Sequence, residues 1–118
     1  MAKNLFRIST SESVNVLELT LPSVIDGADF DNLNESVLDA IQAAAAQPWV
    51  LDLSGVLYVG SAMLGMMINV RQRIKEAEGR LVLCGLSARL NEIFHACCME
   101  RLFTITRSRA DALKAVAR

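Results

Sequence analysis

Two short stretches near the start of the chain alternate between apolar and polar residues. Residues 5–9 (LFRIS) alternate briefly, and residues 14–21 (VNVLELTL) alternate more clearly. A period of two is typical of a β-strand with one buried face. The residues between them, TSES, are turn formers. The pattern predicts a β-hairpin and leaves open whether this hairpin joins the main sheet.

Farther along the chain, apolar residues recur at spacings of three and four, which predicts amphipathic helices. The first runs from about residue 29 to Pro48, the second over 61–77, the third over 87–99 and the fourth from 108 onward. The expected N-caps are Asp29, Ser61, Ser87 and Ser108. Pro48 should end the first helix and Gly79 the second.

Short apolar runs between these helices predict three further strands, over residues 49–54, 80–86 and 102–106. The resulting order is β-β-α-β-α-β-α-β-α. Strands that alternate with helices imply crossover connections and parallel pairing. We therefore expect one α/β domain over residues 1–118, with a mixed, mostly parallel sheet of about five strands and about four helices. Periodicity does not decide whether the helices cover one face of the sheet or both.

The composition narrows the classes of function. Net charge is −1, which argues against a nucleic-acid binder that works by bulk phosphate attraction and against a polybasic membrane contact. The most apolar segment, residues 57–70, is too short to span a bilayer, and the start of the chain has no signal-peptide core. The three cysteines, Cys84, Cys97 and Cys98, form no C-x-x-C and are expected to be small buried side chains in a cytoplasmic protein.

The stretch LYVGSAMLG, residues 57–65, places one hydroxyl, Ser61, in an apolar run between a strand and a helix. As an N-cap, Ser61 would stabilise the helix by about 1 kcal/mol without any further role. The same position also suits a phosphate, because a helix N-terminus carries free N–H groups and partial positive charge. A phosphate there would add about two negative charges to an apolar patch and repel a partner bound by apolar contact.

The lead-in WVLDLSGVLYV, residues 49–59, resembles the segment before the signature D-S-[ST]-G-[LI]-G of STAS domains, the fold of bacterial anti-sigma factor antagonists. The signature is replaced here by GSAMLG, residues 60–65, and Ser61 falls on the phosphorylatable serine of the family. The segments LPSVIDGADFDNL and GRLVLCGLSARLNEIFHACCMERLFTI are also similar to the family. The resemblance covers nearly the whole chain.

The resemblance implies a non-enzymatic protein that binds an anti-sigma factor, a serine kinase of the switch-kinase type, and is phosphorylated by it at Ser61. We also expect no cofactor, no metal, no direct contact with nucleic acid and no membrane insertion, and a homodimer stays open. The expected contact residues are Asp26, Tyr58, Gly60, Ser61, Ala62, Met63, Leu64, Met66 and Met67.

Three departures from the family pattern keep a second interpretation open. Gly60 stands where the family has an Asp, Ala62 where it has a hydroxyl residue, and Met63 where it has a Gly. Without the acidic neighbour, the chain could be a constitutive STAS adaptor, for instance on the ATPase of an ABC-type lipid-transport complex or within a signalling complex. The retained serine favours the antagonist.

Other chemistry has less support in the sequence. A hydrolase would need G-x-S-x-G around its nucleophile, and the glycines at 60 and 65 have the wrong spacing. His95 and Cys98 could share a helix face, but two ligands do not make a zinc site. No phosphate-binding G-x-x-x-x-G-K-[ST] motif is present. Methionines 63, 66 and 67 could be either core or contact surface.

Overall fold

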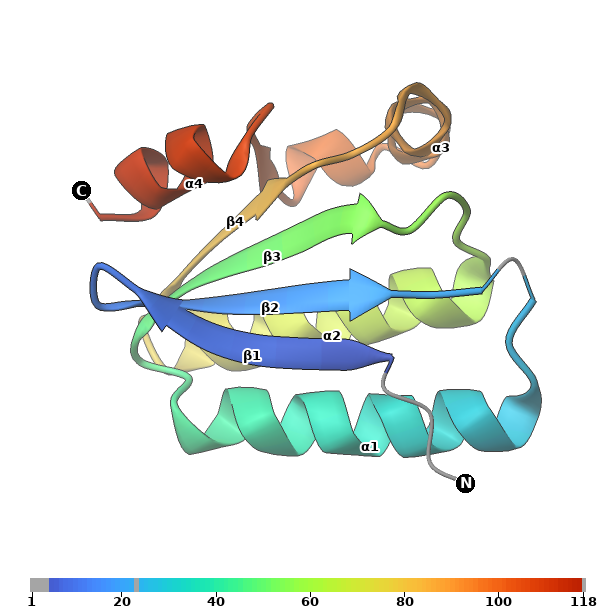
Figure 1. Ribbon diagram of the computed structural model, residues 1–118, viewed down its shortest axis with the longest axis horizontal. Coiled ribbons are helices and arrows are strands. Elements are labelled where there is room, and N and C mark those ends of the chain that lie inside the picture. The colour runs from blue at the N-terminus through green and yellow to red at the C-terminus, as the bar shows by residue number, and fades with distance from the viewer. Residues whose placement is uncertain (1–4, 23, 118) are drawn as a thin grey trace.

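The structure, a computed structural model, describes residues 5–22 and 24–117. Its centre is a five-stranded sheet in the order β1-β2-β3-β4-β5 (Figure 1). The strands are β1 (Phe6–Ser11), β2 (Val14–Thr20), β3 (Pro48–Gly55), β4 (Arg80–Cys84) and β5 (Thr104–Ile105). β1 and β2 pair antiparallel, and all other neighbours pair parallel. The predicted hairpin therefore forms and belongs to the main sheet.

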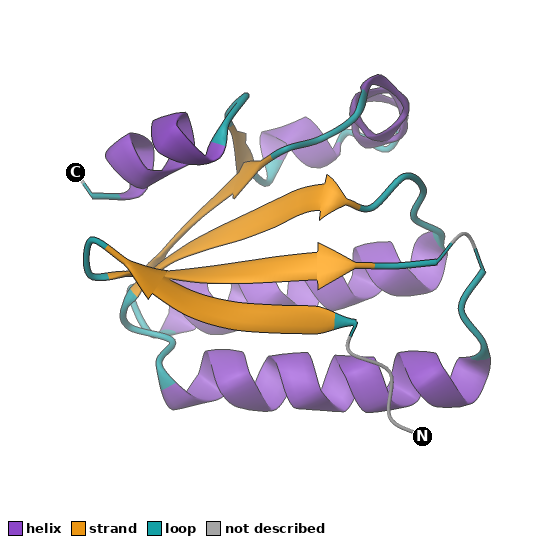
Figure 2. Cartoon of the chain, in the orientation of Figure 1, coloured by secondary structure: helices purple, strands orange, loops and turns teal. Residues whose placement is uncertain are grey.

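Four α-helices connect or follow the strands in the predicted order: α1 (Gly27–Ala43), α2 (Ser61–Glu76), α3 (Ala88–Ala96) and α4 (Arg109–Val116). A single 3₁₀ turn, Met99–Arg101, lies between α3 and β5. Figure 2 shows that the loops before α1 and α2 lie at the same end of the sheet, because β2 and β3 run parallel. This end carries the candidate site.

The helices cover both faces of the sheet, which periodicity left undecided. Leucines of the central strands, among them Leu17, Leu51 and Leu83, belong to one core with the buried faces of α1, α2 and α3. Valines at the alternate positions belong to a smaller core with Ala112 and Val116 of α4. The strand period of two separates these cores, because successive side chains point to opposite faces.

The helix boundaries correct several expectations. Asp26, not Asp29, caps α1: its Oδ1 accepts a hydrogen bond from the Asp29 N–H at 2.7 Å. α1 ends at Ala43, so Pro48 begins β3 instead of ending the helix. Ser87 and Ser108 cap α3 and α4 as predicted, each accepting a backbone N–H at 3.1 Å.

The end of α2 also differs from the prediction. The helix stops at Glu76, and Glu78, at φ 61°, takes the left-handed conformation expected of a terminal glycine. Gly79 is needed for a different reason, because a Cβ there would collide with the backbone carbonyl of Ala45. The glycine therefore permits close packing of two backbone segments.

Only one cysteine is buried as expected. Cys84 lies in the core, whereas Cys97 and Cys98 are exposed. The reason is the early end of α3: its inward positions stop at Phe94, and Cys98 takes a left-handed turn at φ 57°. In the part of the chain that the structure describes, no helix is long and apolar enough to cross a membrane.

Candidate functional site

Ser61 is the first residue of α2 and does not cap it. Gly60, in extended conformation, is the N-cap, and no side chain accepts a hydrogen bond from the N–H groups of the first turn. The first backbone bond of the helix runs from the N–H of Leu64 to the carbonyl of Gly60. The exposed Ser61 hydroxyl is therefore not engaged in a cap, and the predicted capping role was wrong by one residue.

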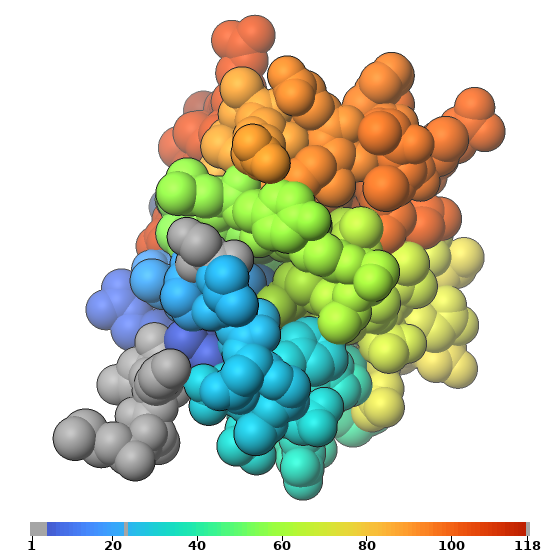
Figure 3. All heavy atoms as spheres, turned by 90° about the vertical axis from the view of Figure 1, so that its right-hand side faces the viewer, coloured from blue at the N-terminus to red at the C-terminus, as the bar shows by residue number. Residues whose placement is uncertain are grey.

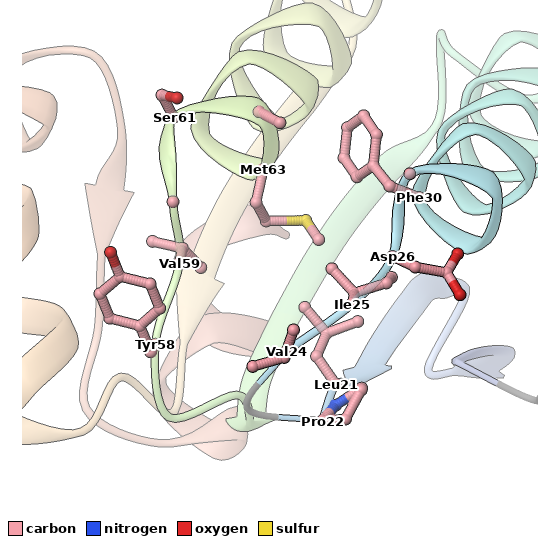
Figure 4. A pocket seen from close by; sticks show the side chains of 13 residues that line it. Leu21, Pro22, Val24, Ile25, Asp26, Phe30, Tyr58, Val59, Ser61 and Met63 are labelled. Atoms are coloured by element: carbon pink, nitrogen blue, oxygen red, sulfur yellow. The ribbon is translucent and has the colours of Figure 1, made fainter.

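An open, mainly apolar pocket of about 480 Å³ lies beside Ser61. Its walls come from the loop before α1, the first turn of α1, the loop before α2 and the first turn of α2. It is lined by Leu21, Pro22, Val24, Ile25, Asp26, Gly27, Phe30, Tyr58, Val59, Gly60, Ser61, Ala62 and Met63. Figure 4 shows the Met63 side chain directed into this space, with Ser61 at its outer edge. Figure 3 views this side of the molecule, where the two loops lie next to each other.

Large apolar side chains are exposed at the pocket, which Val24 and Tyr58 line, and at Leu57, which precedes Tyr58 in the chain. Val24 is 84% exposed, Leu57 69% and Tyr58 50%. The guanidinium of Arg89, at the start of α3, lies 5.6 Å from the centre of the Tyr58 ring, within range of a cation–π contact. A cluster of exposed apolar side chains is typical of an interaction site, whereas scattered single ones are not.

Most of the predicted contact residues meet at this pocket. Asp26, Tyr58, Gly60, Ser61, Ala62 and Met63 line it. Leu64 is half-buried and lies outside the lining. Met66 and Met67 are 2% and 1% exposed, so the prediction that they contact a partner was wrong. They occupy the inward face of α2 and pack in the core.

A cluster of polar and charged side chains lies on the α4 side of the sheet. Asp52 of β3 accepts hydrogen bonds from the backbone N–H and the hydroxyl of Ser54, at 2.9 and 2.6 Å. Its other oxygen accepts two from Arg109, at 3.1 and 2.8 Å. Glu18 on β2 pairs with Arg109 at 2.9 Å and with Arg7 at 3.1 Å. These residues form a paired network that ties the start of α4 to three strands.

Hydrogen bonding in this network shifts the titration of its members. Burial alone would raise the pKa of Asp52, but the bonds from Ser54 and Arg109 together hold this pKa below its usual value. Hydrogen bonds from Arg109 and Arg7 lower the pKa of Glu18. Burial raises the pKa of the neighbouring Cys84 thiol to about 11, so this thiol stays protonated at neutral pH.

Sequence reasoning missed part of both regions. Pro22, Val24 and Phe30 line the pocket, but nothing in their local pattern distinguishes them from ordinary loop and helix residues. The charge of Asp52 within an apolar strand was a usable signal for a buried ion pair, although its partner Arg109 lies 57 residues away. Among the described residues, no cluster of three His, Cys, Asp or Glu side chains could hold a metal ion.

Comparisons with known proteins identify the domain family of the chain and a relative. The sequence profile of the STAS domain matches residues 7–112. A Bordetella bronchiseptica protein named "Putative anti-sigma factor antagonist BtrV" is 30% identical over 95 residues, which cover 80% of this chain and 81% of that protein.

Solved structures show the same fold at lower identity. An anti-sigma-factor antagonist (STAS) domain protein from Planctomyces limnophilus superposes with a TM-score of 0.83 at 23% identity, covering 96% of this chain and 98% of its own. The phosphorylated form of SpoIIAA, a cell fate determinant of Bacillus, superposes with a TM-score of 0.67 at 15% identity, covering 94% of this chain and 98% of its own.

Proposed function

Because the chain belongs to the STAS domain family, we propose that it is an anti-sigma factor antagonist: a non-catalytic protein that binds an anti-sigma factor and is controlled by phosphorylation at Ser61. One observation carries this proposal. The Ser61 hydroxyl is exposed at the edge of an apolar pocket and at the start of a helix without a side-chain cap.

Two features of the geometry support the proposed switch. The N–H groups of the first turn of α2 have no intrahelical acceptor, and together with the helix dipole they would stabilise a phosphate on Ser61. The same phosphate would bring about two negative charges to the edge of the apolar pocket. A partner that covers the pocket would have to desolvate these charges, so phosphorylation would release it.

A second candidate is a constitutive adaptor that binds a partner without a phospho-switch. Gly60 favours it, because the serine lacks the acidic neighbour of the family pattern. The structure offers a direct way to restore that neighbour: a Cβ at Gly60 would meet no atom within 4 Å, and the backbone there is extended. The Cβ of an aspartate at position 60 therefore has room.

The test is incubation of the protein with ATP and a candidate anti-sigma kinase from the same genome, followed by intact-mass measurement. The antagonist gains one phosphate, and Ser61→Ala gains none. Gly60→Asp gains it severalfold faster than the wild type. A stable complex with the kinase and no added phosphate would replace the antagonist with the adaptor.

A further inference from the structure

The part of the chain that builds the pocket contains acids but no bases. No Lys, Arg or His occurs between Arg7 and Arg71. The carboxylates in the same interval are Glu12, Glu18, Asp26, Asp29, Asp31, Glu35, Asp39 and Asp52. Bases occur again from Arg71 onward, and one of them, Arg73 of α2, donates a hydrogen bond to Gln42 near the end of α1 at 3.2 Å.

The pocket itself shares this bias. Asp26 is its sole charged lining residue among those the structure describes. From this rim the acids continue along α1, where Asp31, Glu35 and Asp39 are exposed and spaced four residues apart, on one face of the helix. Like charges at this spacing slightly destabilise an isolated helix, and these three carboxylates lie on its exposed face, where a partner can reach them.

We infer that the pocket receives an apolar side chain of a protein partner, and that Lys or Arg residues beside this side chain lie over Asp26 and the start of α1. The inference rests on the proposed function, which makes the pocket the docking site, and it adds the chemistry of the partner. Charge complementarity selects this occupant, because the pocket has apolar walls and the Asp26 carboxylate, which caps α1, lies at its α1 edge and points outward from the pocket (Figure 4).

The two kinds of contact have different roles. Burial of the apolar side chain supplies most of the affinity, since the walls are mainly apolar and the Met63 side chain adapts readily to an inserted group. The ion pairs over α1 are exposed and contribute less to affinity, but they orient the partner and raise its association rate.

An acidic docking surface is compatible with release by phosphorylation, because the two negative groups lie apart. Figure 4 shows Asp26 and Ser61 on opposite sides of the pocket, with Met63 between them. Basic residues placed over Asp26 are therefore not placed over Ser61. A phosphate on Ser61 would lie on the side of the pocket that carries Tyr58, away from Asp26 (Figure 4).

Three blocked synthetic peptides with the cores Arg-Leu-Arg, Arg-Ala-Arg and Glu-Leu-Glu serve as probes, titrated into ¹⁵N-labelled protein. The Arg-Leu-Arg peptide should shift the amide signals of Asp26, Val59 and Met63 saturably and bind severalfold more tightly than either of the others. Equal binding of Glu-Leu-Glu or Arg-Ala-Arg, or no saturable shift at these amides, would overturn the inference.

A pair of variants separates the pocket carboxylate from general charge. Asp26→Asn removes the charge but keeps the α1 cap, because Asn caps as well as Asp. It should weaken binding of the Arg-Leu-Arg peptide about two- to fivefold, as expected for one exposed ion pair. Glu92→Gln removes an exposed charge from α3 and should leave binding unchanged. Equal effects of the two changes would contradict the role of Asp26.

The outcome is distinguishable from failure of the proposed function. If the natural partner binds in a Ser61-dependent way while the peptides show no preference, the function stands and this inference fails. If the peptides discriminate as expected but no anti-sigma factor binds, the pocket chemistry stands and the proposed function fails.

Discussion

The start of α2 and the start of α4 are built in opposite ways. At α2 the first turn has no side-chain cap, and the neighbouring Val24, Leu57 and Tyr58 are exposed. At α4, Ser108 caps the helix and Arg109 pairs with both Asp52 and Glu18. Polar groups are satisfied within the fold in one region and left to solvent or a partner in the other. Under the proposed function, stability and partner binding therefore depend on separate parts of the molecule.

The largest break in this comparison should come from Arg109→Ala. It removes the partner of two carboxylates, one of them 7% exposed, and should lower the free energy of unfolding by about 2 kcal/mol. Partner binding at the pocket should not change. Urea unfolding measures the effect, and Arg107→Ala is the matched control, because Arg107 is an exposed neighbour. A loss equal to that of the control would show that the network does not stabilise α4.

Acid should weaken the same region. The pKa values of Asp52 and Glu18 are lower in the folded protein than in the unfolded chain, where they are about 4. Their contribution to stability is therefore complete above about pH 5 and is lost as pH falls through the folded-state pKa values. Urea unfolding from pH 7 to pH 3 should show this decline. The decline should be shallower in Arg109→Ala, and parallel curves for the two proteins would contradict the assignment.

The smallest expected effects on unfolding free energy come from residues at the helix N-termini, and they test the difference between the starts of α2 and α4. Ser108→Ala should cost about 1 kcal/mol of unfolding free energy, because the Ser108 hydroxyl accepts the Asp111 N–H. Ser61→Ala should change stability by less than about 0.5 kcal/mol, because Ser61 caps nothing. Thermal or urea unfolding of the two variants distinguishes them. Similar losses of unfolding free energy in the two variants would show that Ser61 caps α2 after all.

Element order, sheet class and two of the caps could be predicted from the sequence, because they depend on local periodicity and on Ser87 and Ser108 directly before apolar runs. The family resemblance, and not periodicity, also predicted that three residues would meet at one site: Asp26, Tyr58 and Ser61.

The predictions from sequence misplaced the ends of some helices and did not foresee a pairing between residues far apart in the chain. Ser61 was predicted to be the N-cap of α2 but lies one residue after it. The helix α3 ends before Cys97, which leaves Cys97 and Cys98 exposed. Periodicity places a face of a helix but not its last turn. The pairing of Asp52 with Arg109 depends on packing of β3 against α4, which no local pattern encodes.

The most direct test of the account measures partner affinity and stability on one variant, Ser61→Asp. A negative charge on the first turn of α2 should leave the free energy of unfolding unchanged or raise it by up to about 1 kcal/mol, because negative charge at a helix N-terminus interacts favourably with the helix dipole. The same charge should weaken binding of the anti-sigma factor by about tenfold or more, or at least about 1.4 kcal/mol. Unchanged affinity, measured by calorimetry on a protein as stable as the wild type, would contradict the claim that the start of α2 is the switchable docking surface.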